Sequence, residues 1–277
     1  MTAIILDGKK VAEKIRQGLK EQIKELGLKP RLAVVLVGSN PASLAYVGAK
    51  EKAAMEIGIE VVKKHLSGDS SEQDVLSVVE EMNNEPSISG MIVQLPLPAH
   101  IDGDRVTQSI LPEKDVDGFS LVHLAELLLG HERHVACTPK GIIRLLEEYK
   151  VAFEGKHAVV VGRSAIVGKP AAALLLNRNC TVTVCHSRTR NLAEHTRRAD
   201  ILVAAVGKAG MVTAGMVKPG AVVVDVGTSR DGQKLAGDVD FEKVKEVASF
   251  ITPVPGGIGP MTVAMLMENT VELAKNG

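Results

Sequence analysis

The stretch Val161-Gly162-Arg163-Ser164-Ala165-Ile166-Val167-Gly168-Lys169-Pro170 decides the fold of the second half of this chain. It follows a short apolar run that predicts a strand, and it leads into a segment that predicts a helix. Gly162 lets the backbone turn sharply out of the strand, and Gly168 permits a close approach of backbone to a ligand or a helix. The N–H groups at the start of that helix suit a pyrophosphate. The spacing is G-x-S-x-x-x-G, not G-x-G-x-x-G, so an ordinary strand-to-helix turn explains the glycines equally well.

The end of the next predicted strand favours a dinucleotide. NAD sites usually carry an acidic residue there, which binds the ribose 2′-hydroxyl, but this strand ends in Cys185-His186-Ser187-Arg188. Ser187 and Arg188, with Arg163 and Ser164 from the first turn, are suited to surround a 2′-phosphate instead. The sequence therefore predicts an NADP site, with NADP preferred over NAD. A solvated basic loop is the alternative interpretation.

Apolar runs separated by helical or turn segments predict a Rossmann-type domain in the second half. The five predicted strands are Ala158–Val161, Thr181–Cys185, Ile201–Ala205, Ala221–Val226 and Ser249–Ile251.

The first half also alternates strands and helices, which predicts a parallel sheet with helical crossovers. The predicted strands are Ile4–Leu6, Leu32–Val37, Ile59–Leu66 and Ile88–Gln94. A helix is expected over 41–57, because Asn40 is a good N-cap, Pro41 suits the first turn and Gly58 suits the end. Further helices are expected over 71–83, 121–129, 139–149 and from 262 to about 275.

These patterns predict two α/β domains with a cleft between them. Residues 1–138 and 263–277 are assigned to a catalytic domain, and residues 139–262 to the Rossmann-type NADP-binding domain.

Composition excludes several classes of protein. The 277 residues contain 33 basic and 33 acidic side chains, so no nucleic-acid or anionic-membrane partner is indicated. The 3 cysteines lack disulfide or C-x-x-C spacing, and no metal-binding arrangement of His and Cys is expected. No apolar run is long enough to span a membrane, and the N-terminal run is too short for a signal peptide. We therefore expect a cytoplasmic enzyme.

Candidate catalytic residues lie in the first half. Tyr46 and Lys50 are four residues apart, so they share one face of the helix over 41–57. An amphipathic helix often produces this pair by chance. Short-chain dehydrogenases use the same pair after their glycine-rich turn, whereas here it precedes the turn, which argues against that family.

Three further segments are expected near the ligands. Gln94 ends a predicted strand, Asp117 lies in the loop 114–119, and residues 253–260 combine three prolines with three glycines. The last segment is stiff and suits a platform for a flat ligand. The alternative interpretations are a strand terminus, a surface turn and an interdomain hinge, respectively.

Together these segments resemble one family, the bifunctional methylenetetrahydrofolate dehydrogenase/methenyltetrahydrofolate cyclohydrolases, along the whole chain. The matching segments are Pro41–Lys50, Val93–Pro98, Lys114–Phe119, Cys137–Gly141, Gly162–Pro170 and Pro255–Thr262.

The resemblance implies that Lys50 is the central catalytic group and that Tyr46 and Gln94 assist it. It also implies that Asp117 is a catalytic residue, which holds the pterin. The implied substrate-binding residues are Tyr46, Lys50, Val93, Gln94, Leu95, Asp117, Pro255, Gly256 and Gly257. The implied cofactor-binding residues are Thr138, Gly162, Arg163, Ser164, Val167, Ser187, Arg188, Gly207, Thr228, Gly257 and Thr262.

The implied reactions use one-carbon derivatives of tetrahydrofolate, and the resemblance implies that the domain of residues 1–138 and 263–277 binds the folate. A hydride passes from 5,10-methylenetetrahydrofolate to NADP, and water then opens the methenyl cation to 10-formyltetrahydrofolate. A homodimer is also implied.

Two places depart from the family pattern. His123, Ala125 and Glu126 stand where the family usually has Asn, Gly and Arg, and Thr228-Ser229 stands where Ile-Asn is expected. These departures concern efficiency and cofactor geometry, not the class of reaction.

Three other functions fit parts of the sequence. One is an NAD(P)-dependent dehydrogenase or reductase of another small substrate, with only hydride chemistry. The second is a monofunctional dehydrogenase of the same family. The third is a catalytically silent nucleotide-binding or scaffolding protein, which leaves Lys50, Gln94 and Asp117 unexplained.

Overall fold

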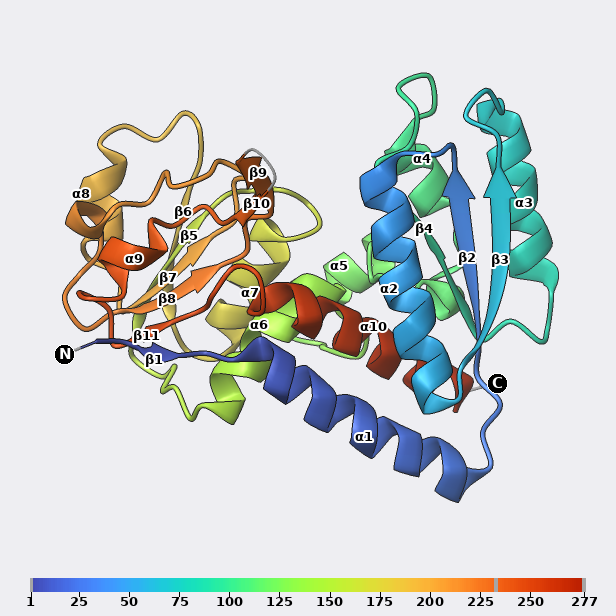
Figure 1. Cartoon of the computed structure of the whole chain (residues 1–277), viewed down its shortest axis with the longest axis horizontal. Coiled ribbons are helices and arrows are strands. Elements are labelled where there is room, and N and C mark those ends of the chain that lie inside the picture. The colour runs from blue at the N-terminus through green and yellow to red at the C-terminus, as the bar shows by residue number, and fades with distance from the viewer. Residues whose placement is uncertain (1, 232–233, 276–277) are drawn as a thin grey trace. The chain divides into compact units, whose positions relative to one another are not determined.

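The chain forms two α/β units in the computed structural model, which describes residues 2–231 and 234–275 (Figure 1). We call them the six-stranded unit, with residues 1–12 and 138–262, and the three-stranded unit, with residues 13–137 and 263–277. The strands are β1 (Ile4–Ile5), β2 (Arg31–Val37), β3 (Glu60–Leu66), β4 (Gly90–Val93), β5 (His157–Val161), β6 (Thr181–Cys185), β7 (Ile201–Ala204), β8 (Val222–Asp225), β9 (Ser229–Asp231), β10 (Lys234–Ala236) and β11 (Phe250–Ile251).

The helices predicted over 41–57, 71–83, 121–129, 139–149 and from 262 are present, with ends that differ by a few residues at most. The α-helices are α1 (Gly8–Leu26), α2 (Pro41–Ile57), α3 (Glu72–Asn84), α4 (Gly103–Gln108), α5 (Leu121–Leu128), α6 (Cys137–Glu148), α7 (Gly168–Asn177), α8 (Leu192–Thr196), α9 (Phe241–Val244) and α10 (Ile258–Ala274). Two 3-10 turns lie at Pro112–Lys114 and Ala214–Met216.

The larger sheet is parallel, with the strand order β1-β11-β8-β7-β5-β6. From β5 the chain passes to β6 on one side and then to β7 on the other. The order therefore reverses between β5 and β7. Open α/β sheets bind ligands at such a switch point, beyond the carboxyl ends of the strands. The predicted Rossmann-type fold is confirmed, with the switch point directly beside the Gly162 turn.

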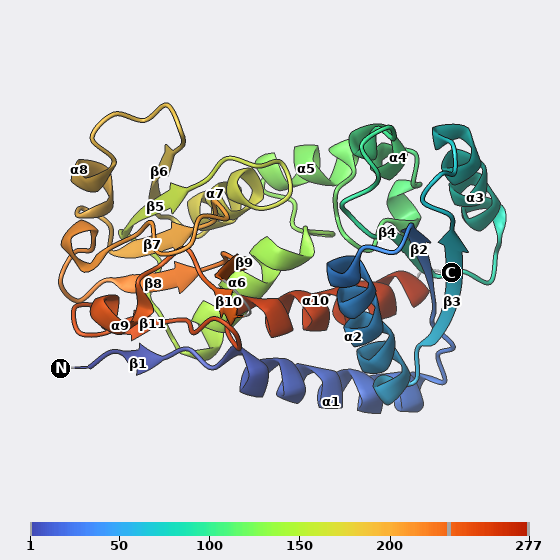
Figure 2. The same ribbon diagram turned by 45° about the horizontal axis from the view of Figure 1, so that its top comes forward.

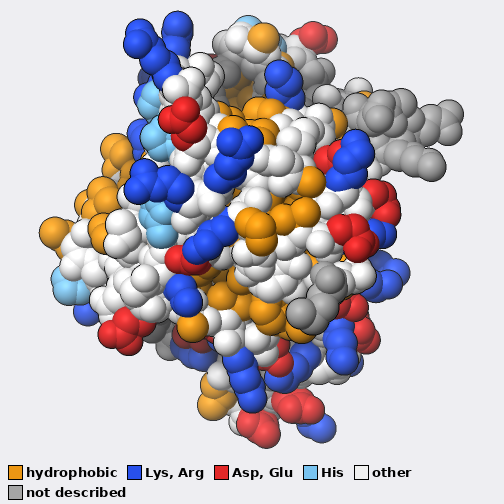
Figure 3. Space-filling view, turned by 90° about the vertical axis from the view of Figure 1, so that its left-hand side faces the viewer, with side chains coloured by type: hydrophobic (Ala, Val, Ile, Leu, Met, Phe, Trp, Pro, Cys, Tyr) orange, Lys and Arg blue, Asp and Glu red, His pale blue; other side chains and the backbone are white. Residues whose placement is uncertain are grey.

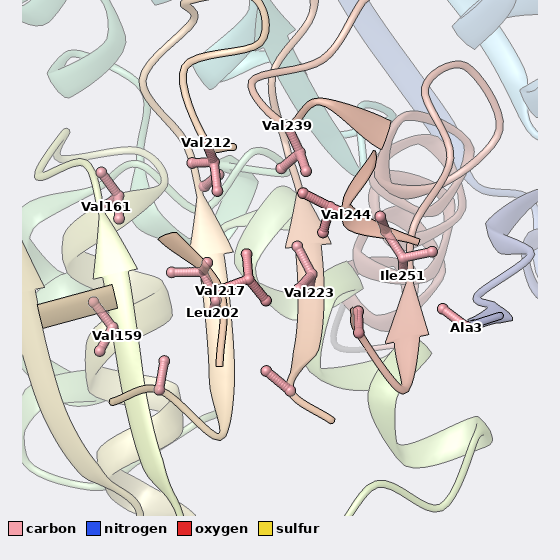
Figure 4. Close-up of a cluster of buried hydrophobic side chains, with 14 of the residues drawn as sticks. Ala3, Val159, Val161, Leu202, Val212, Val217, Val223, Val239, Val244 and Ile251 are labelled. Carbon is pink, nitrogen blue, oxygen red and sulfur yellow. The ribbon is translucent and has the colours of Figure 1, made fainter. Parts of the chain in front are cut away.

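One face of this sheet packs on an apolar core. Alternate residues of neighbouring strands, such as Val159 and Val161 of β5 with Leu202 of β7 and Val223 of β8, point into one cluster of buried side chains (Figure 4). Aliphatic side chains dominate this core, as expected for a chain with 2% aromatic residues.

The position of β1 corrects one prediction. Its strand was expected in the sheet of the first half, but it pairs in parallel with β11 at the edge of the larger sheet. Ala3 N donates to Lys245 O at 2.7 Å, and Ala3 is buried in the core of Figure 4. The first twelve residues thus belong to the six-stranded unit and not, as the expected boundary had it, with residues 13–138.

The smaller sheet is also parallel, with the order β3-β2-β4. Helices α3 and α4 cover one face, where Val75 and Val79 of α3 pack on Val35 of β2. Helix α2 lies on the other side of the sheet, and Figures 1 and 2 both show this arrangement. Since β3 and β4 flank β2, the strand order again reverses, between β2 and β4, and β2 leads directly into α2.

Two local features were not predicted. The hairpin of β9 and β10 follows β8 directly, and α4 lies in a segment for which no helix was predicted. Both are short, so they carry too few residues for a periodic pattern.

In the part of the chain that the structure describes, no helix is long and apolar enough to cross a membrane. Within residues 2–231 and 234–275, no three His, Cys, Asp or Glu side chains are placed to hold a metal ion. On the face shown in Figure 3, basic, acidic and apolar side chains are interspersed.

Candidate functional site

Helix α2 carries two of the predicted catalytic side chains. The Asn40 side chain accepts hydrogen bonds from Ala42 N at 2.9 Å and Ser43 N at 3.3 Å, which starts the helix immediately beyond β2. Tyr46 is 45% exposed, and Lys50, one turn later, is half-buried. The start of α2 therefore places both residues near the carboxyl edge of the small sheet.

Lys50 and Gln94 are in direct contact. Lys50 Nζ donates to Gln94 Oε1 at 3.1 Å, and Gln94 Nε2 donates to the carbonyl of Leu95 at 2.6 Å. A lysine ammonium can only donate and a carbonyl can only accept, so these two contacts determine the orientation of the amide. Gln94 N also donates to Val35 O at 2.9 Å, which anchors the residue to β2. The lysine ammonium is thus positioned by a neutral amide, which does not neutralise its charge.

The positive charge of Lys50 acts on the Asp117 carboxyl. Removal of water around the carboxyl raises the pKa of Asp117, and the positive charge of Lys50 opposes this shift. The two side chains come from separate segments of the three-stranded unit. Lys50, Gln94 and Asp117, predicted separately from the sequence, are therefore brought together.

Asp115, which was not predicted, shapes the loop that carries Asp117. Its carboxylate is buried and accepts hydrogen bonds from Gly118 N at 3.0 Å and Ser120 N at 2.6 Å. Burial raises the pKa of the Asp115 carboxyl, and these N–H groups oppose the shift. The sequence signal was present as a second carboxylate two residues before Asp117, but only the structure shows that it points inward.

Asn269 of α10 is hydrogen-bonded to the same loop. Its Nδ2 donates to Val116 O at 2.9 Å and to Val135 O at 3.1 Å, and the residue is buried. Cys137 N donates to Asp117 O at 3.2 Å. A polar residue within the apolar pattern of α10 was the signal that sequence reasoning missed.

Replacing Asn269 by Leu is expected to destabilise the protein by about 2–4 kcal/mol, because two buried carbonyls lose their donor. The KM for the folate substrate that the resemblance implies should rise, since the loop carrying Asp117 loosens. Denaturant unfolding and steady-state kinetics measure both effects. Glu272→Leu, at an exposed position of the same helix, is the control. A folate KM equal to that of the unsubstituted protein would contradict the proposed support of the loop.

The departures at 123–126 lie beside this loop. His123 Nε2 contacts Pro112 O at 2.8 Å, and its Nδ1 lies 3.9 Å from Glu126 Oε2. The charge of His123 also opposes the raised pKa of Asp115. Ala125 is exposed. His123 is thus bound to the segment just before the loop, and among the described contacts none of the three residues touches Lys50.

The Gly162 turn has the close packing that the sequence predicted. Gly162 has φ +128°, and a Cβ there would lie 3.0 Å from the carbonyl carbon of Ala205. A Cβ at Gly168 would lie 2.6 Å from the carbonyl carbon of Gly162. Ser164 Oγ accepts from Val167 N at 3.2 Å and Gly168 N at 3.3 Å, so this side chain caps the start of α7. Both glycines are needed for the turn.

The basic side chains predicted for the 2′-phosphate follow neighbouring strands. Gly162 N donates to Cys185 O at 2.9 Å, which joins the ends of β5 and β6. Arg163, Ser187 and Arg188 are exposed beyond these ends. The donor set, two guanidinium groups and hydroxyls without a carboxylate, fits a phosphate.

The remaining predicted cofactor residues also lie in the six-stranded unit. Gly207 and Thr228 are exposed in the turns after β7 and β8, and Ser229 opens the β9 strand. Thr138 and Thr262 are hydrogen-bonded through their Oγ1 atoms at 3.0 Å.

The segment 253–260 is closely packed at one end. A Cβ at Gly257 would lie 2.6 Å from Pro253 O, whereas Pro255 is exposed. Lys9 N donates to Gly256 O at 3.0 Å. Pro255, Gly256 and Gly257 belong to the six-stranded unit, and Val93 and Leu95, which flank Gln94, belong to the three-stranded unit.

Both halves of the chain match domains of the same known family. Residues 6–117 match the family model of the tetrahydrofolate dehydrogenase/cyclohydrolase catalytic domain, and residues 136–277 match that of its NAD(P)-binding domain. The bifunctional protein FolD of Halalkalibacterium halodurans is 52% identical over 278 aligned positions, covering 99% of this chain and all of that protein.

Two solved structures cover nearly the whole chain. The bifunctional FolD methylenetetrahydrofolate dehydrogenase/cyclohydrolase of Campylobacter jejuni has a TM-score of 0.96 at 47% identity, covering 99% of each chain. The Trypanosoma brucei FolD enzyme, solved with NADP and an inhibitor, has a TM-score of 0.96 at 37% identity, covering 100% of this chain and 98% of that one. The chain belongs to the tetrahydrofolate dehydrogenase/cyclohydrolase family.

Proposed function

We propose that this protein oxidises 5,10-methylenetetrahydrofolate with NADP and hydrolyses the resulting methenyl cation to 10-formyltetrahydrofolate, in one-carbon metabolism. The observation that carries the proposal is the Lys50–Gln94 contact, with the Lys50 charge also acting on Asp117, in a chain that matches both domains of the family.

Lys50 is the central catalytic group in this proposal. Its ammonium is held at 3.1 Å from Gln94 Oε1, where it can donate a proton or, once deprotonated, accept one from the attacking water. Water adds to the methenyl carbon and loses a proton, one carbon–nitrogen bond of the ring breaks, and the formyl group remains on the other nitrogen. Gln94 orients Lys50 without adding a charge.

Asp117 and Tyr46 are proposed to bind the folate. The Asp117 carboxylate accepts hydrogen bonds from the donor-rich edge of a pterin. Tyr46 offers an exposed ring for stacking and a hydroxyl. Val93 and Leu95 border Gln94 and complete the proposed folate contacts of this unit. The family resemblance implies folate contacts for Pro255, Gly256 and Gly257 as well.

When bound, NADP supplies the nicotinamide that accepts the hydride. The proposed residues for its pyrophosphate are Gly162 and Val167, and those for its 2′-phosphate are Arg163, Ser164, Ser187 and Arg188. Gly207, Thr228, Gly257, Thr138 and Thr262 are proposed for the rest of the cofactor. A homodimer, a cytoplasmic location and the absence of nucleic-acid partners stay predictions.

The paired assay of the two reactions tests the function. NADPH formation from 5,10-methylenetetrahydrofolate and loss of the methenyl chromophore are followed with NADP and with NAD. Both signals are expected, with NADP favoured. NADPH formation without methenyl hydrolysis would instead support the monofunctional dehydrogenase. Absence of both signals would support a silent binding protein.

Replacing Arg163 and Arg188 together by Ala is expected to raise the KM for NADP by about 100-fold, because two charge-assisted hydrogen bonds to phosphate are lost. The KM for NAD should change by less than about threefold, since NAD lacks that phosphate. Initial-rate kinetics with both cofactors measure the difference. Arg144→Ala, at an exposed position of α6, is the control, and equal effects on both cofactors would refute the 2′-phosphate assignment.

A further inference from the structure

A buried carboxylate supports an exposed turn at the switch point of the large sheet. Asp238 is 0% exposed, and its Oδ2 accepts hydrogen bonds from Val206 N at 2.6 Å and Gly207 N at 3.1 Å. Its Oδ1 accepts from Lys208 N at 2.6 Å. One buried carboxylate thus binds three consecutive N–H groups of the exposed turn after β7.

A second buried carboxylate holds the first. Asp225, at the end of β8 and 3% exposed, accepts from Asp238 N at 2.8 Å and Val239 N at 2.9 Å. It also accepts from Gly227 N at 2.9 Å, and its own N–H donates to Thr252 Oγ1 at 2.7 Å. The ends of β7 and β8 are therefore connected through Asp225 and Asp238.

Two glycines leave room for these carboxylates. A Cβ at Gly227 would lie 2.5 Å from Asp238 Cγ, and a Cβ at Gly237 would lie 2.6 Å from Asp225 Cγ. On its other side, the segment of Asp238 is tied to the chain after the turn, because Val212 N donates to Asp238 O at 2.9 Å. The arrangement is closely packed from the backbone of β8 to the turn after β7.

Two buried carboxylates close together destabilise each other's charged form, and backbone hydrogen bonds offset this effect. Removal of water raises the pKa of Asp225 to about 6, and the charge of Asp238 adds to this, whereas the hydrogen bonds from Val239, Asp238 and Gly227 oppose it. Each carboxylate accepts three backbone N–H groups. An amide could not replace Asp238, because its NH₂ group would meet a backbone N–H.

The turn lies where the cofactor is expected. β5 and β7 are neighbours at the switch point, and Gly162 after β5 packs on Ala205, the residue just before the turn. We propose that Asp238 is a positioning residue, whose carboxylate holds the Val206–Lys208 turn in its cofactor-binding shape before the dinucleotide arrives, with Asp225 holding Asp238. This inference rests on the proposed function, because it takes NADP to bind at this edge.

A turn formed in advance needs no ordering on binding, so the benefit appears as cofactor affinity. Asp238→Asn in the full chain is expected to raise the Kd for NADPH, followed by its fluorescence, by about tenfold or more, because the NH₂ group opposes one N–H of the turn. The KM for NADP should rise in parallel. The kcat at saturating NADP should stay within about threefold, because bound cofactor restores the turn.

Asp240→Asn is the matched control. Asp240 lies two residues later and pairs with the exposed Lys243 at 2.9 Å, away from the turn. Its substitution should leave the Kd for NADPH unchanged. Hydrolysis of methenyltetrahydrofolate, which uses no NADP, reports separately whether Asp238→Asn has damaged the whole protein.

Amide hydrogen exchange of the unsubstituted protein without cofactor gives an independent test that needs no variant. The amides of Val206, Gly207 and Lys208 should exchange at least about 100-fold more slowly than in a free peptide, because a buried acceptor holds each one. Free exchange at these amides, or an unchanged NADPH Kd in folded Asp238→Asn, would overturn the inference. Failure of the unsubstituted protein to bind either NADP or NADPH would instead reject the proposed function.

Discussion

Lys50→Met is expected to lower the rate of methenyltetrahydrofolate hydrolysis by about a thousandfold or more, a loss of about 4 kcal/mol of transition-state stabilisation. Methionine has a side chain of similar length, but that side chain has no proton to transfer and no charge. It therefore removes the proposed proton transfer and the donor to Gln94 Oε1 at 3.1 Å, with little change in volume. Asp117 also loses the positive charge that opposes the rise of its pKa.

The measurement is loss of the methenyl chromophore, with NADPH binding followed by fluorescence in the same preparation. Lys52→Met, at an exposed position of the same helix α2, is the matched control and should retain both properties. NADPH should bind to Lys50→Met as to the unsubstituted protein, because the proposed cofactor residues lie in the other unit. Full hydrolysis by Lys50→Met would remove Lys50 from the proposed mechanism.

The sequence predicts the elements that start and stop on strong local signals. Helix α2 has Asn40 as its N-cap and ends at Gly58, whose φ of +93° is the left-handed conformation that glycine favours. Buried parallel strands such as β2 are continuous apolar runs, so they too were predicted. Helix α10 starts at Ile258, earlier than the expected Thr262, because Pro260 fits within a first turn, where no N–H is needed.

Features that depend on distant partners were not predictable. β1 has only two residues, and nothing in them specifies pairing with β11, far away in the chain. Asp115, Asn269 and Asp238 are ordinary polar residues in sequence, and their importance comes from burial against backbone groups of other segments. Lys50 and Gln94 were singled out individually, but only the fold brings Nζ within 3.1 Å of Oε1.

The two units place their candidate residues by the same rule. In each sheet the strand order reverses beside the first strand of the βαβ unit, β2 in one and β5 in the other. The segment after that strand begins a helix, α2 or α7, and the segment after the strand across the switch point supplies the partner, Gln94 or the turn at Gly207. Both predicted sites thus follow from topology as much as from individual residues.

Gly168→Ala is expected to weaken NADPH binding by about 100-fold or more while methenyltetrahydrofolate hydrolysis continues. The added Cβ would lie 2.6 Å from the carbonyl carbon of Gly162 and 2.8 Å from Arg163 N. Both atoms are backbone, so no side-chain rotation relieves the overlap, and the turn must open. A shift that costs about 3 kcal/mol corresponds to that loss of affinity.

Gly162→Ala should act on the same turn more strongly, because alanine also disfavours φ +128°, and its Cβ meets the carbonyl group of Ala205. Gly215→Ala is the matched control, since nothing lies within 4 Å of its added Cβ and its unit is the same. NADPH fluorescence titration and both activity assays separate the effects. If Gly168→Ala bound NADPH normally, the close packing of this turn would have no part in cofactor binding. If it lost both activities together, the effect of the substitution would not be confined to the cofactor turn, and this prediction would fail.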